Sequence, residues 1–209
     1  MNRNRHLGLA VCILFLLGAA AKAQMPQPFS ADFTASSASH AGDVTGKMFL
    51  SLPNMRMNMS SRGMDMSMIM DGAKQTTYML MHQQHMYMEL KPGQLNPMAR
   101  NLPQVESSFD PHNPCASSQH SDATCKDLGE ATWDGRTCEK WLMTQKNGHS
   151  TTMWVDQKLH FPIRSENSDG SIFAFSNIKE GTQPASLFVV PPDYRQMDVG
   201  GMMGGQRPH

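Results

Sequence analysis

The sequence predicts a mainly β protein built on a single curved antiparallel sheet, an incomplete barrel with little helix. From Phe29 onward, apolar and polar residues alternate with a period of two, which is typical of strands that bury one face and expose the other. Turn-forming residues interrupt these runs at the short spacing of consecutive hairpins. No internal repeat or long linker divides the chain, so we expect one domain over residues 24–198.

The composition is that of a globular domain with one unusual number. Of 209 residues, 39% are hydrophobic and 17% are charged, and the formal net charge is +0. This balance lacks the electrostatic footprint of a nucleic-acid-binding protein, so we expect no nucleic-acid partner. The chain has 20 methionines, more than its 9 phenylalanines, 3 tryptophans and 3 tyrosines together. Any proposed function has to account for these methionines.

Residues 1–23 have the pattern of a secretory signal peptide. Arg3 and Arg5 precede the uncharged apolar run Leu7–Ala21, and Ala21-Lys22-Ala23 provides the small–x–small cleavage signature. No later stretch is apolar enough to span a bilayer as a helix. We therefore expect a protein of the periplasm, or one otherwise exported, that is soluble after cleavage.

The cysteines are interpreted in that oxidising compartment. Cys12 falls in the signal and follows Val11 rather than a small residue, so we expect no lipid anchor. Cys115 and Cys125 lie in a polar stretch and are expected to close a short disulfide loop. Cys138 lies in an apolar strand pattern and is expected to be a buried small hydrophobe. The sequence leaves open a pairing of Cys138 with either of the others.

The first half of the chain is expected to form a meander of short strands. Polar breaks separate them at Pro53-Asn54, at Asp71-Gly72 and over His82–His85. Methionines occupy alternate positions in most of them. The strands are expected at Phe29–Ala35, Val44–Ser51, Met55–Ser60, Met64–Asp71, Thr77–Met81 and Met86–Leu90.

Residues 91–130 contain five prolines and are expected to connect two sets of strands, with the disulfide loop and one short helix near Pro97–Phe109. Asn147-Gly148 and Asp169-Gly170 are expected to form type I′ turns. Residues 199–209 have too few apolar side chains to bury and are expected to be disordered. The later strands are expected at Ala131–Trp133, Arg136–Met143, Thr151–Asp156, His160–Glu166, Ser171–Ile178 and Leu187–Val190.

No local signature of catalysis occurs in the chain. The motifs G-x-S-x-G, G-x-G-x-x-G and H-E-x-x-H and the Walker A loop are missing, so we expect no enzyme and assign no catalytic residue. Methionine is unbranched and flexible, and it suits surfaces that accept ligands of varied shape. We expect a hydrophobic cavity for a lipid or acyl group, with no cofactor. Its lining is expected to be Met55, Met57, Met59, Met66, Met68, Met79, Met81, Met86, Met88 and Trp154.

The alternative is a copper site in one predicted hairpin. Thioether and imidazole groups suit Cu(I), and this hairpin gathers both kinds of side chain. The candidate ligands are Met79, Met81, His82, His85, Met86 and Met88. A structural explanation is also sufficient, because the methionines repeat at strand period and the histidines occupy a polar turn.

Several segments, in order, resemble the LolA/LolB-like superfamily of exported lipoprotein-localisation factors, and more closely its DUF4412 branch. They are Gly46–Met57, Asp71-Gly72 with Tyr78, Trp154–Asp156, Phe161–Arg164 and Leu187–Pro192. The resemblance implies an incomplete, strongly curved antiparallel barrel whose mouth is closed by helices and which encloses a hydrophobic cavity.

The resemblance also implies a function. We expect an exported, non-enzymatic binding protein whose partner is a lipid or a lipoprotein acyl chain, with peripheral contact to the membrane. Leu52 stands where the lipoprotein carriers have an arginine tied to cargo release, so the resemblance does not extend to lipoprotein transfer. Related folds serve as envelope-stress sensors, which makes an envelope protein the other expected partner.

Overall fold

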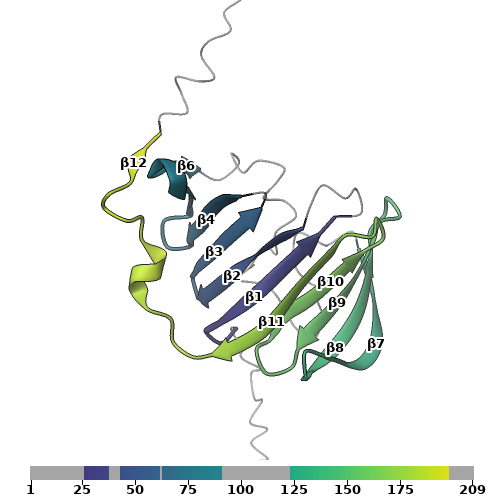
Figure 1. Ribbon diagram of the computed structural model, residues 1–209. Helices are drawn as coiled ribbons and strands as arrows, with labels where there is room; N and C mark the ends of the chain where they lie inside the picture. Colours follow the sequence, from purple (N-terminus) through teal and green to yellow (C-terminus); the bar gives the residue numbers. More distant parts are fainter. Residues whose placement is uncertain (1–25, 38–42, 62, 91–122, 198–209) are drawn as a thin grey trace, which may run out of the picture.

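The computed structural model describes residues 26–37, 43–61, 63–90 and 123–197. They form one open antiparallel sheet that is not closed into a barrel, as Figure 1 shows, and the predicted fold class is confirmed. In the described part, helix is limited to the 3-10 turns η1 (His82–Gln84) and η4 (Ala185–Phe188).

Two meanders make up the sheet. The first comprises β1 (Phe29–Ser36), β2 (Val44–Ser51), β3 (Asn54–Ser61), β4 (Met64–Asp71), β5 (Thr76–Met81) and β6 (Met86–Leu90). The second comprises β7 (Thr124–Trp133), β8 (Arg136–Thr144), β9 (Ser150–Asp156), β10 (Phe161–Asn167) and β11 (Ile172–Glu180). Within each meander, neighbours in sequence are neighbours in the sheet, and β1 pairs with β11 to join the two. A short β12 (Arg195–Gln196) adds to β6 in parallel.

The main core lies where the meanders meet. The alternation predicted for β1 puts Phe29, Ala31 and Phe33 inside, with at most 1% of each exposed. The ring of Phe33 stacks on Phe173 of β11 at 5.5 Å between centroids, and Phe29 meets Phe161 edge-on at 5.4 Å. Such aromatic pairs add to the stabilisation that apolar burial provides, so this cluster fixes the joint between β1 and β11.

Gly46 of β2 is a position where a side chain has no room. A Cβ built on it would lie 1.9 Å from the backbone oxygen of Asn58 and 2.7 Å from the ring of Phe33. The Phe33 ring therefore covers the glycine from the neighbouring strand. An aromatic side chain over a strand glycine compensates for the missing contacts of that residue.

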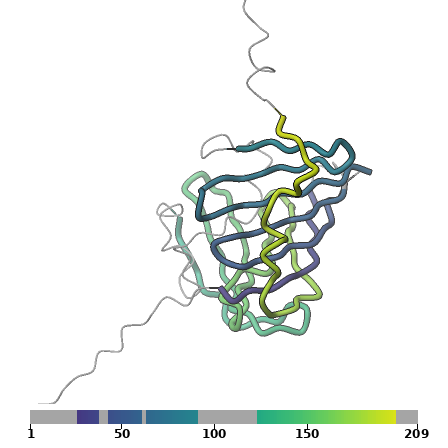
Figure 2. Tube along the Cα trace, turned by 90° about the vertical axis from the view of Figure 1, so that its left-hand side faces the viewer, coloured from purple at the N-terminus to yellow at the C-terminus, as the bar shows by residue number. Residues whose placement is uncertain are grey.

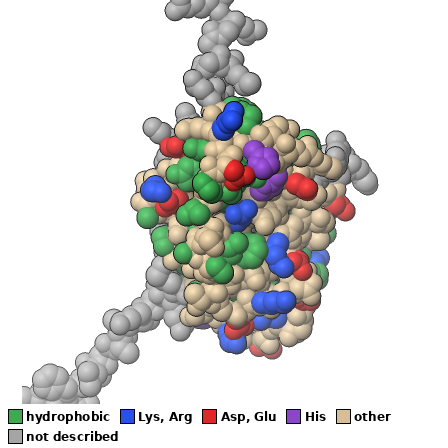
Figure 3. Space-filling model, turned by 60° about the vertical axis from the view of Figure 1, so that its left-hand side comes forward, with side chains coloured by type: hydrophobic (Ala, Val, Ile, Leu, Met, Phe, Trp, Pro, Cys, Tyr) green, Lys and Arg blue, Asp and Glu red, His purple; other side chains and the backbone are tan. Residues whose placement is uncertain are grey.

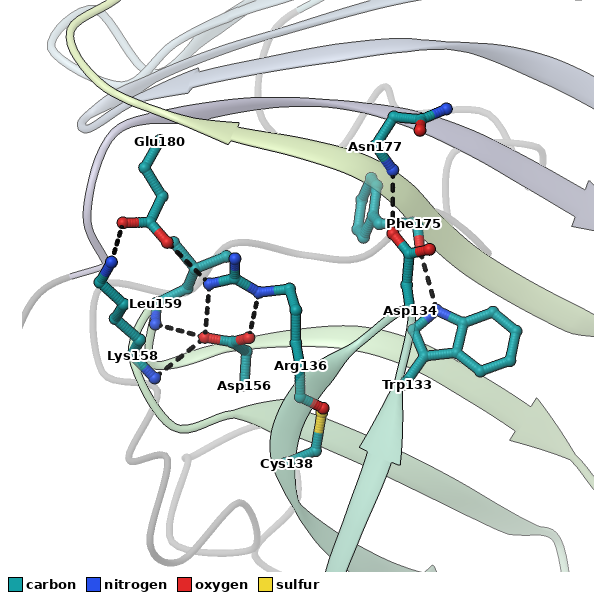
Figure 4. A network of polar contacts seen from close by, with 10 residues as sticks. All are labelled: Trp133, Asp134, Arg136, Cys138, Asp156, Lys158, Leu159, Phe175, Asn177 and Glu180. Atoms are coloured by element: carbon teal, nitrogen blue, oxygen red, sulfur yellow. Dashed lines mark hydrogen bonds and ion pairs between the residues drawn. The ribbon is translucent and has the colours of Figure 1, made fainter.

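A buried polar network holds one end of the second meander (Figure 4). Asp156, at the end of β9, is 1% exposed and accepts hydrogen bonds from Arg136 Nε at 2.5 Å, Leu159 N at 2.6 Å and Lys158 N at 2.9 Å. Arg136 also donates to Glu180 on β11 at 2.9 Å, and both carboxylates raise the pKa of this guanidinium. The network thus connects β8 and β9 to β11.

A second contact brings the β7–β8 turn to β11. The indole of Trp133 donates to the backbone oxygen of Phe175 at 2.8 Å, and Asp134 accepts a hydrogen bond from the Asn177 amide at 3.0 Å. In the sheet, β8, β9 and β10 lie between β7 and β11. These contacts across the intervening strands show that the second meander is strongly curved, as predicted.

The structure corrects three local predictions. β7 begins at Thr124 rather than Ala131, because it pairs with β8 along its whole length, with one bulge between Asp127 and Gly129. Leu187–Val190 is not a strand; it begins in η4, where prolines flank the turn. The two Asn-Gly and Asp-Gly turns are not type I′, because only their glycines have positive φ, at 85° and 81°. They are three-residue loops with a glycine bulge, closed by hydrogen bonds from Gly148 N to Gln145 O and from Gly170 N to Asn167 O.

Other predictions fall outside the described residues. These are the signal over 1–23, the short helix near Pro97–Phe109, Cys115 of the expected disulfide, and the tail over 199–209. Cys138 is a free thiol and fully buried, which removes the two alternative pairings; the Cys115–Cys125 bond stays a prediction. Burial raises the pKa of the Cys138 thiol to about 11, so it is a poor nucleophile. Among the described residues, no helix is both long and apolar enough to cross a membrane.

Candidate functional site

One face of the first meander consists largely of methionine, and we call it the methionine face. Strand alternation turns these side chains to the same side of β2–β6, and the antiparallel register aligns them between strands. The face comprises Met48, Met55, Met57, Met59, Met64, Met66, Met68, Met70, Met79, Met81, Met86 and Met88.

The register arranges most of them in two rows that run across the strands. The long row is Met48, Met57, Met68, Met79 and Met88, one from each of β2 to β6. The short row is Met59, Met66, Met81 and Met86, one from each of β3 to β6, and it meets Gly46 at β2. Residues in directly opposite positions have Cβ atoms about 4.5–5.5 Å apart, so each row places methionine side chains next to one another across the strands.

Burial falls along this face from β2 toward β6. Met48 and Met57 are 0% exposed and Met68 is 3% exposed, and they belong to the main core. Met79 and Met88, at the other end of the long row, are only partly buried, as are all four members of the short row. The outer part of the methionine face therefore combines apolar character with access from outside.

The structure brings together nine of the ten residues predicted to line a cavity. Only Trp154 lies elsewhere, on β9 of the second meander, and it joins the same apolar cluster as Met55 and Met57. Its ring is covered by cations, with Lys140 Nζ at 4.4 Å and the Arg164 guanidinium at 5.2 Å. Trp154 therefore supports the core and carries cation–π contacts.

The opposite face of β3–β6 is covered by the C-terminal strap, which we define as residues 185–197. Figure 2 shows this segment crossing the strands of the first meander. Phe188 of the strap is 8% exposed and packs on Ile69 and Leu80, which are fully buried. The strap continues as β12, where Arg195 N and Met197 N donate to His85 O and Tyr87 O.

A polar cluster lies beneath the strap. Ser67, which is fully buried, donates its hydroxyl proton to Asn58 Oδ1 at 2.7 Å. His82 Nε2 lies 2.7 Å from Ser67 Oγ, and His82 Nδ1 lies 2.5 Å from the hydroxyl of Tyr194 on the strap. Arg56 donates to Ser67 Oγ at 3.2 Å and to Leu187 O at 3.0 Å.

The donors and acceptors of this cluster indicate which nitrogen of His82 donates a hydrogen bond and which accepts one. Because Asn58 Oδ1 accepts the Ser67 hydroxyl proton, Ser67 Oγ is left to accept from His82 Nε2, and in a neutral ring Nδ1 then accepts from Tyr194. In this arrangement His82 donates to Ser67 and does not accept its proton. Burial, and after it the charge of Arg56, lowers the pKa of His82, which favours the neutral ring.

The six candidate copper ligands are divided between the two faces. Met79, Met81, Met86 and Met88 lie on the methionine face, whereas both histidines are bonded to the strap. His85 Nδ1 lies 2.7 Å from Asp193 Oδ2, and Figure 3 shows histidine and acidic side chains together near hydrophobic side chains on this side of the molecule. The histidines and the methionines of this hairpin therefore do not converge on one site.

Acidification is expected to loosen the strap. Since the pKa of His82 is lowered from 6.5 in the folded state, the unfolded state binds the extra proton more readily, and the strap's stability falls as pH drops below about 6.5. Hydrogen exchange of the Arg195 and Met197 amides, compared at pH 7.5 and pH 5, measures local opening of the strap. We expect more frequent opening at pH 5. The His82→Gln variant is expected to lack the difference. An equal pH effect in that variant would show that His82 is not its source.

Comparisons with known proteins agree with this architecture. The model of a family described as Domain of unknown function (DUF4412) matches residues 32–160, more than half of the chain, which confirms the predicted branch. No curated protein matches the sequence.

Solved structures share the fold at low sequence identity. An uncharacterized conserved protein from Thermus thermophilus superposes with a TM-score of 0.55 at 9% identity, over 82% of this chain and 90% of that one. MucB superposes with a TM-score of 0.57 at 16% identity, over 82% of this chain and 60% of its own. The MucA/MucB complex of Pseudomonas aeruginosa gives a TM-score of 0.52 at 16% identity, over 80% of this chain and 56% of that one. The chain thus spans less than two thirds of the MucB chains.

Proposed function

This chain belongs to the DUF4412 family, and we propose that it is an exported, non-enzymatic binding protein whose methionine face takes a lipid or the acyl chain of a lipoprotein. The observation that carries the proposal is the graded burial of that face, with thioethers buried at β2 and β3 and accessible at β5 and β6. An acyl chain needs an apolar surface without charges, and no titratable side chain alternates onto this face of β2–β6.

Methionine is well suited to such a ligand. Its three rotatable side-chain bonds let the surface repack around chains of different length or saturation at little cost. Branched aliphatic side chains, which strands ordinarily favour, are stiffer and would fix one shape. The proposal therefore accounts for the choice of methionine as well as for the apolar character of the face.

Native mass spectrometry of protein purified from its own envelope tests this function, together with uptake of a fluorescent fatty acid by the delipidated protein. We expect a co-purified lipid and saturable uptake. Met81→Lys places a charge in the accessible part of the face and is expected to abolish uptake. Met153→Lys, at a partly buried methionine of the second meander, is the matched control and is expected to retain it. No bound lipid together with no uptake, or equal uptake by both variants, would contradict the proposal.

The second candidate function is binding of an exported protein segment. It is favoured by the edge of the first meander, where β6 already accepts the extended residues Arg195 and Gln196 as a parallel strand. Addition of a strand to a sheet edge is a common mode of peptide recognition. A structure of MucB in complex with MucA(peri), with a TM-score of 0.51 to this chain, shows that a protein of this fold binds another protein. Cross-linking in the envelope with a photoreactive residue at Glu89 tests this candidate, and labelling of lipid alone would exclude it.

A further inference from the structure

We propose that the short row of Met59, Met66, Met81 and Met86 is a binding site for a soft monovalent cation, Cu(I) or Ag(I), held by thioether sulfurs without any histidine. The site is separate in chemistry from the apolar ligand proposed above, although it lies on the same face. It differs from the hairpin site predicted from the sequence, because the ligands come from four strands.

The register supplies the geometry. Met59 is opposite Met66, Met66 is opposite Met81, and Met81 is opposite Met86. Opposite residues in antiparallel strands have Cβ atoms about 4.5–5.5 Å apart. Each sulfur is at the end of a side chain with three rotatable bonds, so three adjacent thioethers of the row can converge on one ion.

Burial distinguishes the short row from the long row. The long row begins with Met48, Met57 and Met68, which are at most 3% exposed and packed in the main core. Those sulfurs cannot reorient without opening the core. All four members of the short row are only partly buried, so an ion can reach them.

The donor set selects the ion. Thioether is a neutral, soft ligand that suits Cu(I), whereas Ca²⁺ and Mg²⁺ require oxygen and Zn²⁺ prefers thiolate, imidazole or carboxylate. In β4 and β6, the carboxylates Asp65, Asp71 and Glu89 alternate to the face that bears the strap. His82 and His85 are bonded to Tyr194 and Asp193 of the strap. In the described part of β2–β6, the short row therefore has thioethers as its only metal ligands of appreciable strength.

This composition has a consequence for pH. A thioether does not titrate, so the affinity of the short row for the ion is expected to be the same at pH 5 and pH 8. A site that used His82 or His85 would weaken as pH falls, because protons compete for imidazole.

Titration of the full mature chain with Ag(I) and with Cu(I), followed by NMR of ¹³C-methyl-labelled methionine, tests the proposal. We expect one equivalent to bind and the methyl signals of the short row, assigned with single Met→Leu variants, to shift first. The Met66→Leu/Met81→Leu double variant keeps volume and apolar character but removes two sulfurs. It is expected to weaken binding by roughly tenfold or more, since even an outer-shell partner of a metal contributes that much.

Two controls make the result specific. Met153→Leu and the His82→Ala/His85→Ala double variant are expected to bind as the wild type does. Fatty-acid uptake by the wild-type protein is measured in parallel with its Ag(I) binding, so failure of the metal site and failure of the proposed function are distinguishable. Unchanged Ag(I) binding by that variant, loss of binding by the histidine variant, or weaker binding at pH 5 than at pH 8 would each overturn the proposal.

Discussion

Replacement of Asp156 with alanine is expected to lower the free energy of unfolding by about 3–5 kcal/mol, because it removes a buried carboxylate that pairs with Arg136 and accepts hydrogen bonds from two backbone amides. Asp156 is 1% exposed and accepts hydrogen bonds from the Arg136 side chain and from the Lys158 and Leu159 amides. In the variant the two amides lose this acceptor, and the Arg136 side chain keeps its hydrogen bond to Glu180. Urea denaturation followed by tryptophan fluorescence measures the change.

The matched control for Asp156 is Lys158→Ala. Its ammonium is 2.6 Å from Glu180, but the Lys158 side chain is 74% exposed. Exposed ion pairs contribute about 0–1 kcal/mol, so this variant is expected to be nearly as stable as the wild type. Equal losses in the two variants would mean that burial of Asp156 is not the source of its effect.

Replacement of Met57 with alanine is expected to cost about 2–5 kcal/mol, since it removes a fully buried side chain and leaves a cavity. Met57→Leu conserves volume and is expected to cost less than about 1.5 kcal/mol. The same truncation at Met64, which is 54% exposed, is expected to change stability by no more than about 0.5 kcal/mol. Thermal unfolding followed by circular dichroism ranks the three variants. A Met64→Ala loss as large as that of Met57→Ala would contradict the burial gradient of the methionine face.

The strands and the composition of the methionine face could be predicted from the sequence, because both depend on local alternation. Met55, Met57 and Met59 share an inward phase that any strand over these residues must give them. The ends of strands were less predictable. β7 extends to Thr124 because β8 is there to pair with it, and that pairing is a tertiary effect that exposed residues do not reveal.

The positions of the histidines could not be predicted, for a related reason. A turn residue has no fixed side, and the orientation of His82 depends on Ser67 within the same meander and on Tyr194, more than one hundred residues away in sequence. The same holds for Asp156, which alternation alone would place as an ordinary polar residue at the end of a strand. Contacts between distant segments determine both groups, and alternation carries no information about such contacts.

The joint between the meanders has a consequence for how the chain folds. Every other antiparallel pair in the described sheet is a hairpin between successive strands, whereas β1 and β11 lie at opposite ends of the described chain. Hairpins within a meander close small loops and form early, while the β1–β11 pair must close the largest loop and forms at the greatest entropic cost. We therefore expect two locally ordered halves to precede the complete sheet. In that intermediate the phenylalanines of β1 remain uncovered, so it is the species most prone to aggregation during folding.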